Sequence, residues 1–178
     1  MSGSENICSH MISNLSAVIR YSLSDPLEDV TVKEEINYLK KYLDIMKLRY
    51  PNKFNIEFRI DPTCENDSLK KMILQPLVEN SIYHGIKEKE GVGKIGIGAR
   101  CLKDTVAFFI YDNGIGINTE ILEQLNRQMN SADEIIQQHM GLANTNLRLK
   151  LAYGNEARLH IKSKKGAFTF IYFFIKRS

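Results

Sequence analysis

The sequence predicts an α+β fold, a two-layer sandwich in which helices cover one face of a mixed β-sheet, preceded by an α-helical segment. Three observations lead to this fold. Apolar residues recur at helical spacing in three stretches of the chain. Beyond residue 53, the pattern runs strand, helix, strand, strand, helix, strand, strand. Short turns join two consecutive strand pairs, which makes the strands of each pair antiparallel neighbours.

The composition is that of an ordinary globular domain. The chain has 178 residues, of which 43% are hydrophobic and 25% charged, enough for one domain with an extension. Its 24 basic and 21 acidic residues give a net charge of +3, and no basic stripe predicts nucleic-acid binding. No apolar run approaches the ~20 residues of a membrane helix. Cys8, Cys64 and Cys101 are too few and too scattered for a disulfide framework, so we expect reduced thiols in a cytosolic domain.

Two helices are expected before residue 53. The first carries an apolar stripe at spacings of three and four, consisting of Cys8, Ile12, Leu15, Ile19 and Leu23. It ends at Asp25-Pro26, because the residue before proline avoids the helical region. Thr31 then predicts an N-cap, with Glu34 completing a capping box, and this second helix stops near Pro51.

The remaining elements follow from alternation and turn residues. We expect a strand at 54–60, a helix at 68–88, strands at 95–101 and 105–111, a helix at 142–151, and strands at 157–163 and 168–175. Pro76 must either kink the helix at 68–88 or start a new one. Residues 118–138 form a polar segment. These elements predict two parts of the chain, 1–52 and 53–178.

One motif with chemical potential follows the strand at 105–111. Asp112-Asn113-Gly114-Ile115-Gly116-Ile117 places a carboxylate at a strand end, where it can accept a hydrogen bond from a ligand amine. The glycines allow a ligand to approach the backbone closely. Taken alone, the motif is a weak signal, because Asp-Asn-Gly is more typical of an ordinary turn.

Two further polar groups lie on or beside helices. Glu79 and Asn80 interrupt an otherwise apolar helix, and their oxygens suit Mg²⁺, which usually arrives with phosphates. Gly141, followed by Leu142, opens the helix at 142–151, where exposed amides favour an anion. A solvent-facing helix pair and a plain loop-to-helix junction are the alternative interpretations.

Together, these motifs resemble a known family. The segments LQPLVENSIYHG (74–85), DNGIGI (112–117) and GLAN (141–144) are similar, in this order, to the N, G1 and G2 boxes of the GHKL (Bergerat) ATP-binding fold. The catalytic domain of sensor histidine kinases is the best match within this fold. The phrase LQPLVEN, the segment 31–50 and RYSL (20–23) resemble the YesM/LytS-like branch of bacterial two-component systems. Residues 166–169 resemble the family's GxGT motif.

The resemblance implies a role for each matching residue. Asn80 would coordinate Mg²⁺ on the ATP phosphates, and Glu79 beside it would orient or polarise the attacking group. Asp112 would accept the adenine amine. The rest of the nucleotide site would comprise His84, Gly114, Gly116, Ile117, Gly141, Leu142 and Thr169. Residues 118–138 would form the ATP lid.

The resemblance also implies an activity and partners. The implied reaction is transfer of the γ-phosphoryl group of ATP to a histidine of the same or a partner subunit, followed by delivery to a response regulator. The NPHF-like acceptor segment of the branch is not found, and the neighbours of His10 do not match it. We therefore expect the acceptor histidine upstream, this piece to be inactive alone, and the full-length protein to be a homodimer anchored in the bacterial membrane.

Three departures keep other interpretations open. Tyr83 replaces a lysine that is common in relatives, His139 replaces the first glycine of the G2 box, and Phe168 replaces the second glycine of GxGT. A GHKL ATPase, a serine kinase of this fold, and a degenerate nucleotide-binding module that docks a response regulator remain alternatives.

Overall fold

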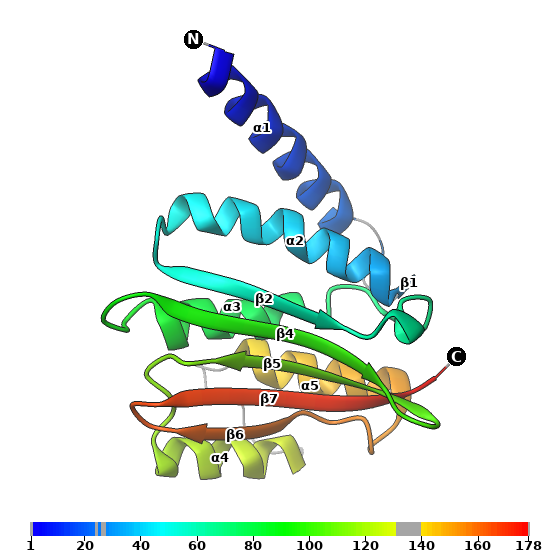
Figure 1. The fold of residues 1–178 in the computed structure, drawn as a ribbon. Coiled ribbons are helices and arrows are strands. Elements are labelled where there is room, and N and C mark those ends of the chain that lie inside the picture. The colour runs from blue at the N-terminus through cyan, green and yellow to red at the C-terminus, as the bar shows by residue number, and fades with distance from the viewer. Residues whose placement is uncertain (1, 24, 26–27, 131–139, 178) are drawn as a thin grey trace.

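The fold is a five-stranded sheet with helices on one face (Figure 1), in a computed structural model that describes residues 2–23, 25, 28–130 and 140–177. The strands are β2 (Phe54–Ile60), β4 (Gly93–Cys101), β5 (Thr105–Asp112), β6 (His160–Lys164) and β7 (Phe168–Lys176). Their order is β2-β4-β5-β7-β6. Only β2 and β4 pair in parallel, and the other pairs are antiparallel. The predicted α+β sandwich with a mixed sheet is confirmed.

Two helices precede the sheet, as predicted. They are α1 (Ser2–Leu23) and α2 (Val32–Arg49). Thr31 caps α2: its Oγ1 accepts from Glu34 N at 3.1 Å, and Glu34 Oε2 accepts from Thr31 N at 2.8 Å. This reciprocal pair satisfies amide groups that the first helical turn leaves free. In Figure 1, α1 projects away from the sheet while α2 lies along the β2 edge.

The predicted helix at 68–88 is wrong in its first half. Residues Ser68–Lys70 form β3, which pairs antiparallel with β1 (Asp29–Thr31). A turn follows, held by the buried carboxylate of Glu35, which accepts from Met72 N at 3.0 Å and Leu74 N at 3.1 Å. These bonds occupy amide groups that a helix would need for itself, so no helix forms there.

The helix begins only at Gln75, the residue before Pro76. Helix α3 spans Gln75–Asn80, with Pro76 in its first turn, where a missing N–H costs nothing. It continues as a π-helical segment, η2 (Ser81–Ile86). A short 3-10 helix, η1 (Pro62–Cys64), lies between β2 and β3. Of the two possibilities for Pro76, the structure therefore shows the new start.

Two more helices complete the covered face. Helix α4 (Thr119–Asn130) arises within the polar segment and buries Leu125 and Met129, and α5 is Met140–Tyr153. Asn146 of α5 donates to Met129 O at 3.2 Å and accepts from Leu159 N at 2.8 Å. These two bonds connect α5 to α4 and to the residue that precedes β6. Figure 1 shows α3 and α5 behind the sheet.

A single apolar core joins these layers. Phe108 and Phe173 stack at 5.1 Å between their ring centroids at the middle of the sheet, and Leu39 and Leu43 of α2 belong to the same cluster. The division at residue 53 stays a prediction. Among the described residues, no helix has the length and apolarity needed to cross a membrane.

Candidate functional site

Asp112 ends β5 as a deeply buried carboxylate, only 1% exposed. Its Oδ1 accepts from Gly114 N at 2.9 Å. Its Oδ2 and the nearby Ser81 Oγ are also buried, and neither has a hydrogen-bond partner among the residues that the structure describes. Burial raises the pKa of Asp112 to about 6, an effect that the Gly114 N–H and, more weakly, the neighbouring Ser81 hydroxyl oppose. The site thus holds an acceptor whose burial is costly until a donor reaches it.

Glycines surround this carboxylate at very short range. A Cβ at Gly85 would lie 2.6 Å from Asp112 Oδ1, and a Cβ at Gly114 would lie 2.3 Å from the backbone of Gly85. Gly116 has a φ of +63°, and a side chain there would also meet Lys164 O at 2.1 Å. The G1-like motif therefore needs glycine for backbone contact and, at Gly116, for conformation as well.

Two hollows open beside these glycines. The first, of about 140 Å³, is lined by Pro76, Glu79, Asn80, Tyr83, His84, Gly141 and Leu142. The second, of about 470 Å³, is lined by His84, Ile115, Gly116, Ile117, Asn118, Ile121 and Lys165. His84 lines both, so the hollows are neighbours. The fold brings seven residues of the predicted site to their walls, while Asp112, Gly114 and Thr169 lie buried close by.

Thr169 is next to Asp112 in the sheet. The two residues are partners in the β5–β7 register, and both are buried. Thr169 Oγ1 lies 3.2 Å from Ser163 Oγ, and Ser163 Oγ in turn accepts from Ile117 N at 2.8 Å. This hydroxyl pair fastens the end of the G1-like motif to β6 and β7. Sequence reasoning missed Ser163 because nothing in its local pattern distinguishes it from a solvent-facing strand residue.

Glu79 is held by a chain of side chains that begins on α2. Tyr38 Oη donates to Gln75 Oε1, and Gln75 Nε2 donates to Glu79 Oε1 at 2.8 Å. Tyr42, also on α2, lies beside Glu79, and burial together with that carboxylate raises the pKa of its phenol. Glu79 therefore has a defined orientation at the wall of the smaller hollow. The sequence signal that could have revealed this was the spacing of Gln75 and Glu79 by one helical turn.

The oxygen ligands that this site offers suit Mg²⁺ only when phosphate is also present. In the part of the chain that the structure describes, no group of three or more His, Cys, Asp or Glu side chains could hold a metal ion. Asn80 and Glu79 line one hollow and offer an amide and a carboxylate oxygen. Mg²⁺ commonly binds through one or two protein ligands, with substrate phosphates and waters completing the octahedron. The residues present fit that arrangement.

The departures from the family pattern have different positions. Tyr83 lines the smaller hollow, and its hydroxyl accepts from Arg49 Nη1 at 3.4 Å, so a cation of α2 lies beside the position of the expected lysine. Phe168 lies on the other face of the sheet, with its ring 6.3 Å from that of Tyr111, and touches neither hollow. His139 lies outside the described residues, as does the 131–138 part of the predicted lid, and the His10 side chain is also not described.

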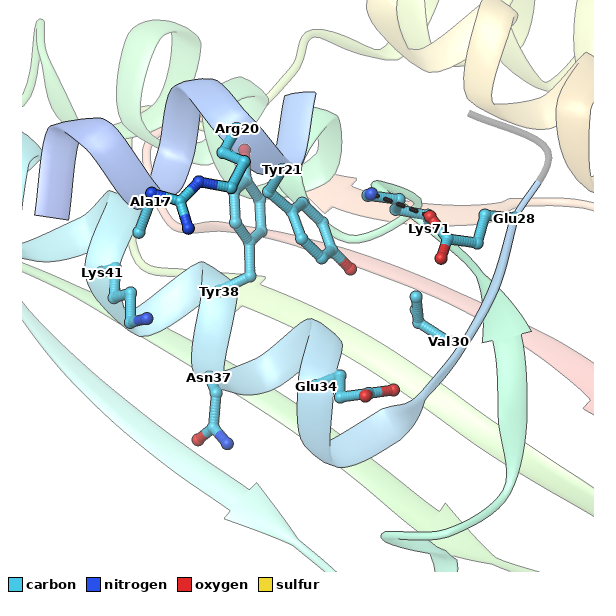
Figure 2. Close-up of a pocket in the computed structure, with 10 residues that line it drawn as sticks. All are labelled: Ala17, Arg20, Tyr21, Glu28, Val30, Glu34, Asn37, Tyr38, Lys41 and Lys71. Atoms are coloured by element: carbon cyan, nitrogen blue, oxygen red, sulfur yellow. Dashed lines mark hydrogen bonds and ion pairs between the residues drawn. The ribbon is translucent and has the colours of Figure 1, made fainter. Parts of the chain in front are cut away.

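A third hollow, of about 530 Å³, lies between the end of α1, α2 and β1, and it contains none of the predicted site residues (Figure 2). Tyr21 of α1 stacks on Tyr38 with 4.0 Å between ring centroids, and its hydroxyl donates to Glu35 Oε2 at 2.8 Å. Figure 2 shows the Lys71–Glu28 ion pair, 3.1 Å long, on the other side of Tyr21. This hollow is an anchoring region for α1 rather than a part of the Asp112 site.

Comparison with known proteins gives two family matches. Residues 66–178 match the family of histidine kinase-, DNA gyrase B- and HSP90-like ATPases, and residues 1–54 match the histidine kinase family. The chain is 30% identical over 168 residues to the sensor protein kinase HptS of Staphylococcus aureus (strain USA300). The match covers 94% of this chain but only 32% of that relative, so the chain spans about a third of its length.

Solved structures show the same fold at low sequence identity. The catalytic domain of histidine kinase ThkA superposes with a TM-score of 0.62 at 18% identity, covering 84% of this chain and 95% of that one. ThkA in complex with the response regulator protein TrrA gives a TM-score of 0.58 at 16% identity, covering 98% of this chain and 49% of that one.

Proposed function

Because the chain belongs to the family of histidine kinase-, DNA gyrase B- and HSP90-like ATPases, we propose that it binds Mg²⁺–ATP at the Asp112 site and transfers the γ-phosphoryl group to a histidine. The observation that carries the proposal is the unpartnered, buried Oδ2 of Asp112. An adenine amine would supply the donor that this oxygen lacks. Guanine presents a carbonyl oxygen at the same place, so the carboxylate selects adenine.

The two hollows bind different parts of the nucleotide. The larger one, bordered by Gly116 and Ile117, receives the base and ribose next to Asp112, and Thr169 closes the base side. The smaller one, bordered by Asn80 and Leu142, receives the phosphates. Gly141 lies at the start of α5, on the exposed side of this smaller hollow. The backbone amides at this end of the helix favour an anion there. His84, which lines both hollows, contacts the nucleotide between its base and its phosphates.

Phosphoryl transfer to histidine then depends on positioning. An imidazole nitrogen attacks the γ-phosphorus, a P–N bond forms, and the P–O bond to the leaving ADP breaks. Asn80 holds the Mg²⁺, which neutralises charge on the phosphate oxygens when it is bound. Glu79, fixed by Gln75, faces the same hollow and orients the attacking imidazole by accepting the N–H on its other nitrogen.

The partners follow from this activity. We propose a phosphoacceptor histidine in the same or a partner subunit of a homodimeric full-length protein of the YesM/LytS-like branch, anchored in the bacterial membrane. The phosphoryl group then passes to a response regulator. The histidine kinase match at residues 1–54 and the fold shared with ThkA, which was solved in complex with the response regulator protein TrrA, support this proposal.

Calorimetry tests the nucleotide site directly. We expect ATP to bind in the presence of Mg²⁺, GTP to bind at least tenfold more weakly, and Asn80→Asp to reduce the gain in affinity that Mg²⁺ provides. Asp44→Asn, at an exposed position of α2, serves as the control variant. A folded protein that binds neither nucleotide would refute the proposal and favour a degenerate docking module.

Transfer is tested by supplying the acceptor in trans. A helical fragment containing an NPHF-like histidine is incubated with the chain and γ-labelled ATP. Acid-labile, base-stable label on the fragment is the expected result, since phosphohistidine has this stability. ATP hydrolysis without labelling of the fragment would favour an ATPase, and acid-stable label would favour a serine kinase.

A further inference from the structure

The face of the sheet opposite α3 and α5 has a ladder of aromatic side chains. The register of β5, β6 and β7 places on this face Phe109, Tyr111, Phe168, Phe170, Tyr172 and Phe174. Tyr111 and Phe174 are each 37% exposed, although apolar faces of this kind are usually covered. Among the described residues, no element lies over β4, β5 and β7 on this side, as Figure 1 shows. The face is therefore a large, uncovered aromatic surface.

Basic residues border the aromatic ladder on both sides. The strands, all of which the structure describes, present six cations on this face: Arg59, Lys94, Arg100, Lys162, Lys164 and Lys176. Glu57 is the one acidic residue that these strands place on the same face, and it is paired with Arg59 at 2.8 Å; Asp61, just beyond the end of β2, also interacts electrostatically with Arg100. The face thus has a net charge of +5, whereas the whole chain has +3, so the remaining surface is net negative. The positive charge of the protein is concentrated where its aromatic residues are exposed.

A shallow hollow interrupts the face beside the ladder. It has a volume of about 550 Å³, and its walls include Phe109, Tyr111 and Phe170 on one side and Arg59 and Lys94 on the other, together with Glu57, which is paired with Arg59. Gly96 forms part of its floor, and a side chain there would meet nothing nearer than Tyr111 Cβ at 3.8 Å. Cations at the rim of an open, aromatic-walled depression suit an anionic head group.

We infer that this sheet face binds the surface of an anionic phospholipid bilayer. Aromatic residues are enriched at the boundary between head groups and acyl chains, and lysines and arginines are attracted to anionic lipids. The face offers both classes of residue on one surface, with Lys162 and Lys164 on one flank and Arg59 and Lys94 on the other. Because the cations flank the ladder, they can reach the head groups while the rings enter the interface.

Two other anionic partners fit the observations less well. Single-stranded nucleic acid needs free ring faces on which bases stack. Here His160 and Tyr172 already stack on each other at 4.9 Å and 15°, and Lys162 lies over Tyr172. Protein interfaces are depleted in lysine, whereas four of the six cations on this face are lysines.

Vesicle binding tests the inference, independently of ATP binding. The chain is sedimented with vesicles of phosphatidylcholine containing about 30% phosphatidylserine, and with pure phosphatidylcholine vesicles. We expect binding to the anionic vesicles only, and weaker binding as salt is added. The double variant Lys162→Gln/Lys164→Gln should bind about 30-fold more weakly, at about fivefold for each lost charge. Lys33→Gln/Lys47→Gln removes the same charge from exposed positions of α2 and should bind like the unmodified chain.

A fluorescent reporter identifies the face that contacts the lipid. The chain has no tryptophan, so Tyr111→Trp places a single indole on the aromatic ladder, and Leu48→Trp places one at an exposed position of α2. Anionic vesicles should shift the emission of the first to shorter wavelength and leave the second unchanged. Circular dichroism confirms that each variant is folded.

Several results would overturn the inference. They are the absence of binding to anionic vesicles, equal weakening in both lysine double variants, and an emission shift at position 48 but not at 111. Tighter binding to oligo(dT) or to an acidic polypeptide such as polyglutamate than to vesicles would assign the face to that class of partner instead.

Discussion

Asp112→Asn is expected to weaken ATP binding and, at the same time, to stabilise the nucleotide-free domain at neutral pH. Both effects arise because the carboxylate is buried with one oxygen unpartnered. A hydrogen bond to a charged acceptor contributes about 1.5–3 kcal/mol, so losing it should weaken ATP binding about 10- to 150-fold. The asparagine amide would also present a donor to the adenine amine, which places the loss toward the upper end.

The stability effect follows from the raised pKa of Asp112. In the folded state the pKa is about 6, against an ordinary value of 3.8, which corresponds to about 3 kcal/mol. Between these two pH values the folded state binds more protons than the unfolded state, so its stability falls as pH rises. Above about pH 7 the wild type has lost all of the stabilisation that protonated Asp112 provides. Asparagine is neutral at every pH, so the variant does not lose stability in this way. The variant should therefore melt roughly 6–12 °C higher at about pH 8.

Thermal melting of both proteins across the pH range measures this effect. The difference in melting temperature should be large at about pH 8 and shrink toward zero near pH 4, where Asp112 is protonated. Asp44→Asn, an exposed position on α2, is the control and should shift neither melting nor ATP affinity. A variant that is destabilised equally at all pH values, or that binds ATP like the wild type, would refute the reasoning. ATP affinity of the wild type should itself decrease below about pH 6, since the adenine amine needs an ionised acceptor.

Three further predictions concern the surroundings of the site. Gly114→Ala should lower both melting temperature and ATP affinity, because its Cβ would lie 2.3 Å from the Gly85 backbone. Gly96→Ala is the control, because Gly96 also lacks a positive φ but its Cβ would meet nothing nearer than 3.8 Å. Gln75→Leu should reduce the rate of phosphoryl transfer in trans about tenfold, with little change in ATP affinity. The reason is that the Gln75 side chain positions Glu79 and does not line the nucleotide hollows. Equal losses of transfer rate and ATP affinity would contradict this role. Thr31→Ala should cost about 1 kcal/mol of folding stability by removing the α2 cap, measured by urea unfolding, and ATP binding should stay unchanged.

Local patterns in the sequence predicted most elements and the residues of the candidate site. Thr31 and Glu34 predicted the start of α2 because a capping box satisfies backbone amides within a few residues. Alternation and turn residues predict the strands of the sheet, and the short connection between the strands expected at 95–101 and 105–111 makes β4 and β5 antiparallel neighbours. The motif at 112–117 named Asp112, Gly114 and Gly116 without any knowledge of the contacts around them.

Long-range contacts determined the rest. Residues 71–74 form a turn because Glu35, far away in the sequence, accepts from the amides of Met72 and Leu74, and no local pattern reveals that partner. Likewise, Asp112 becomes an unpartnered buried acceptor only when β7 brings Thr169 beside it and η2 brings Gly85 against Gly114. Residue types and spacings, which are local, set the chemistry that this chain can offer. The burial that makes this chemistry selective comes from packing between distant segments, so it required the folded structure.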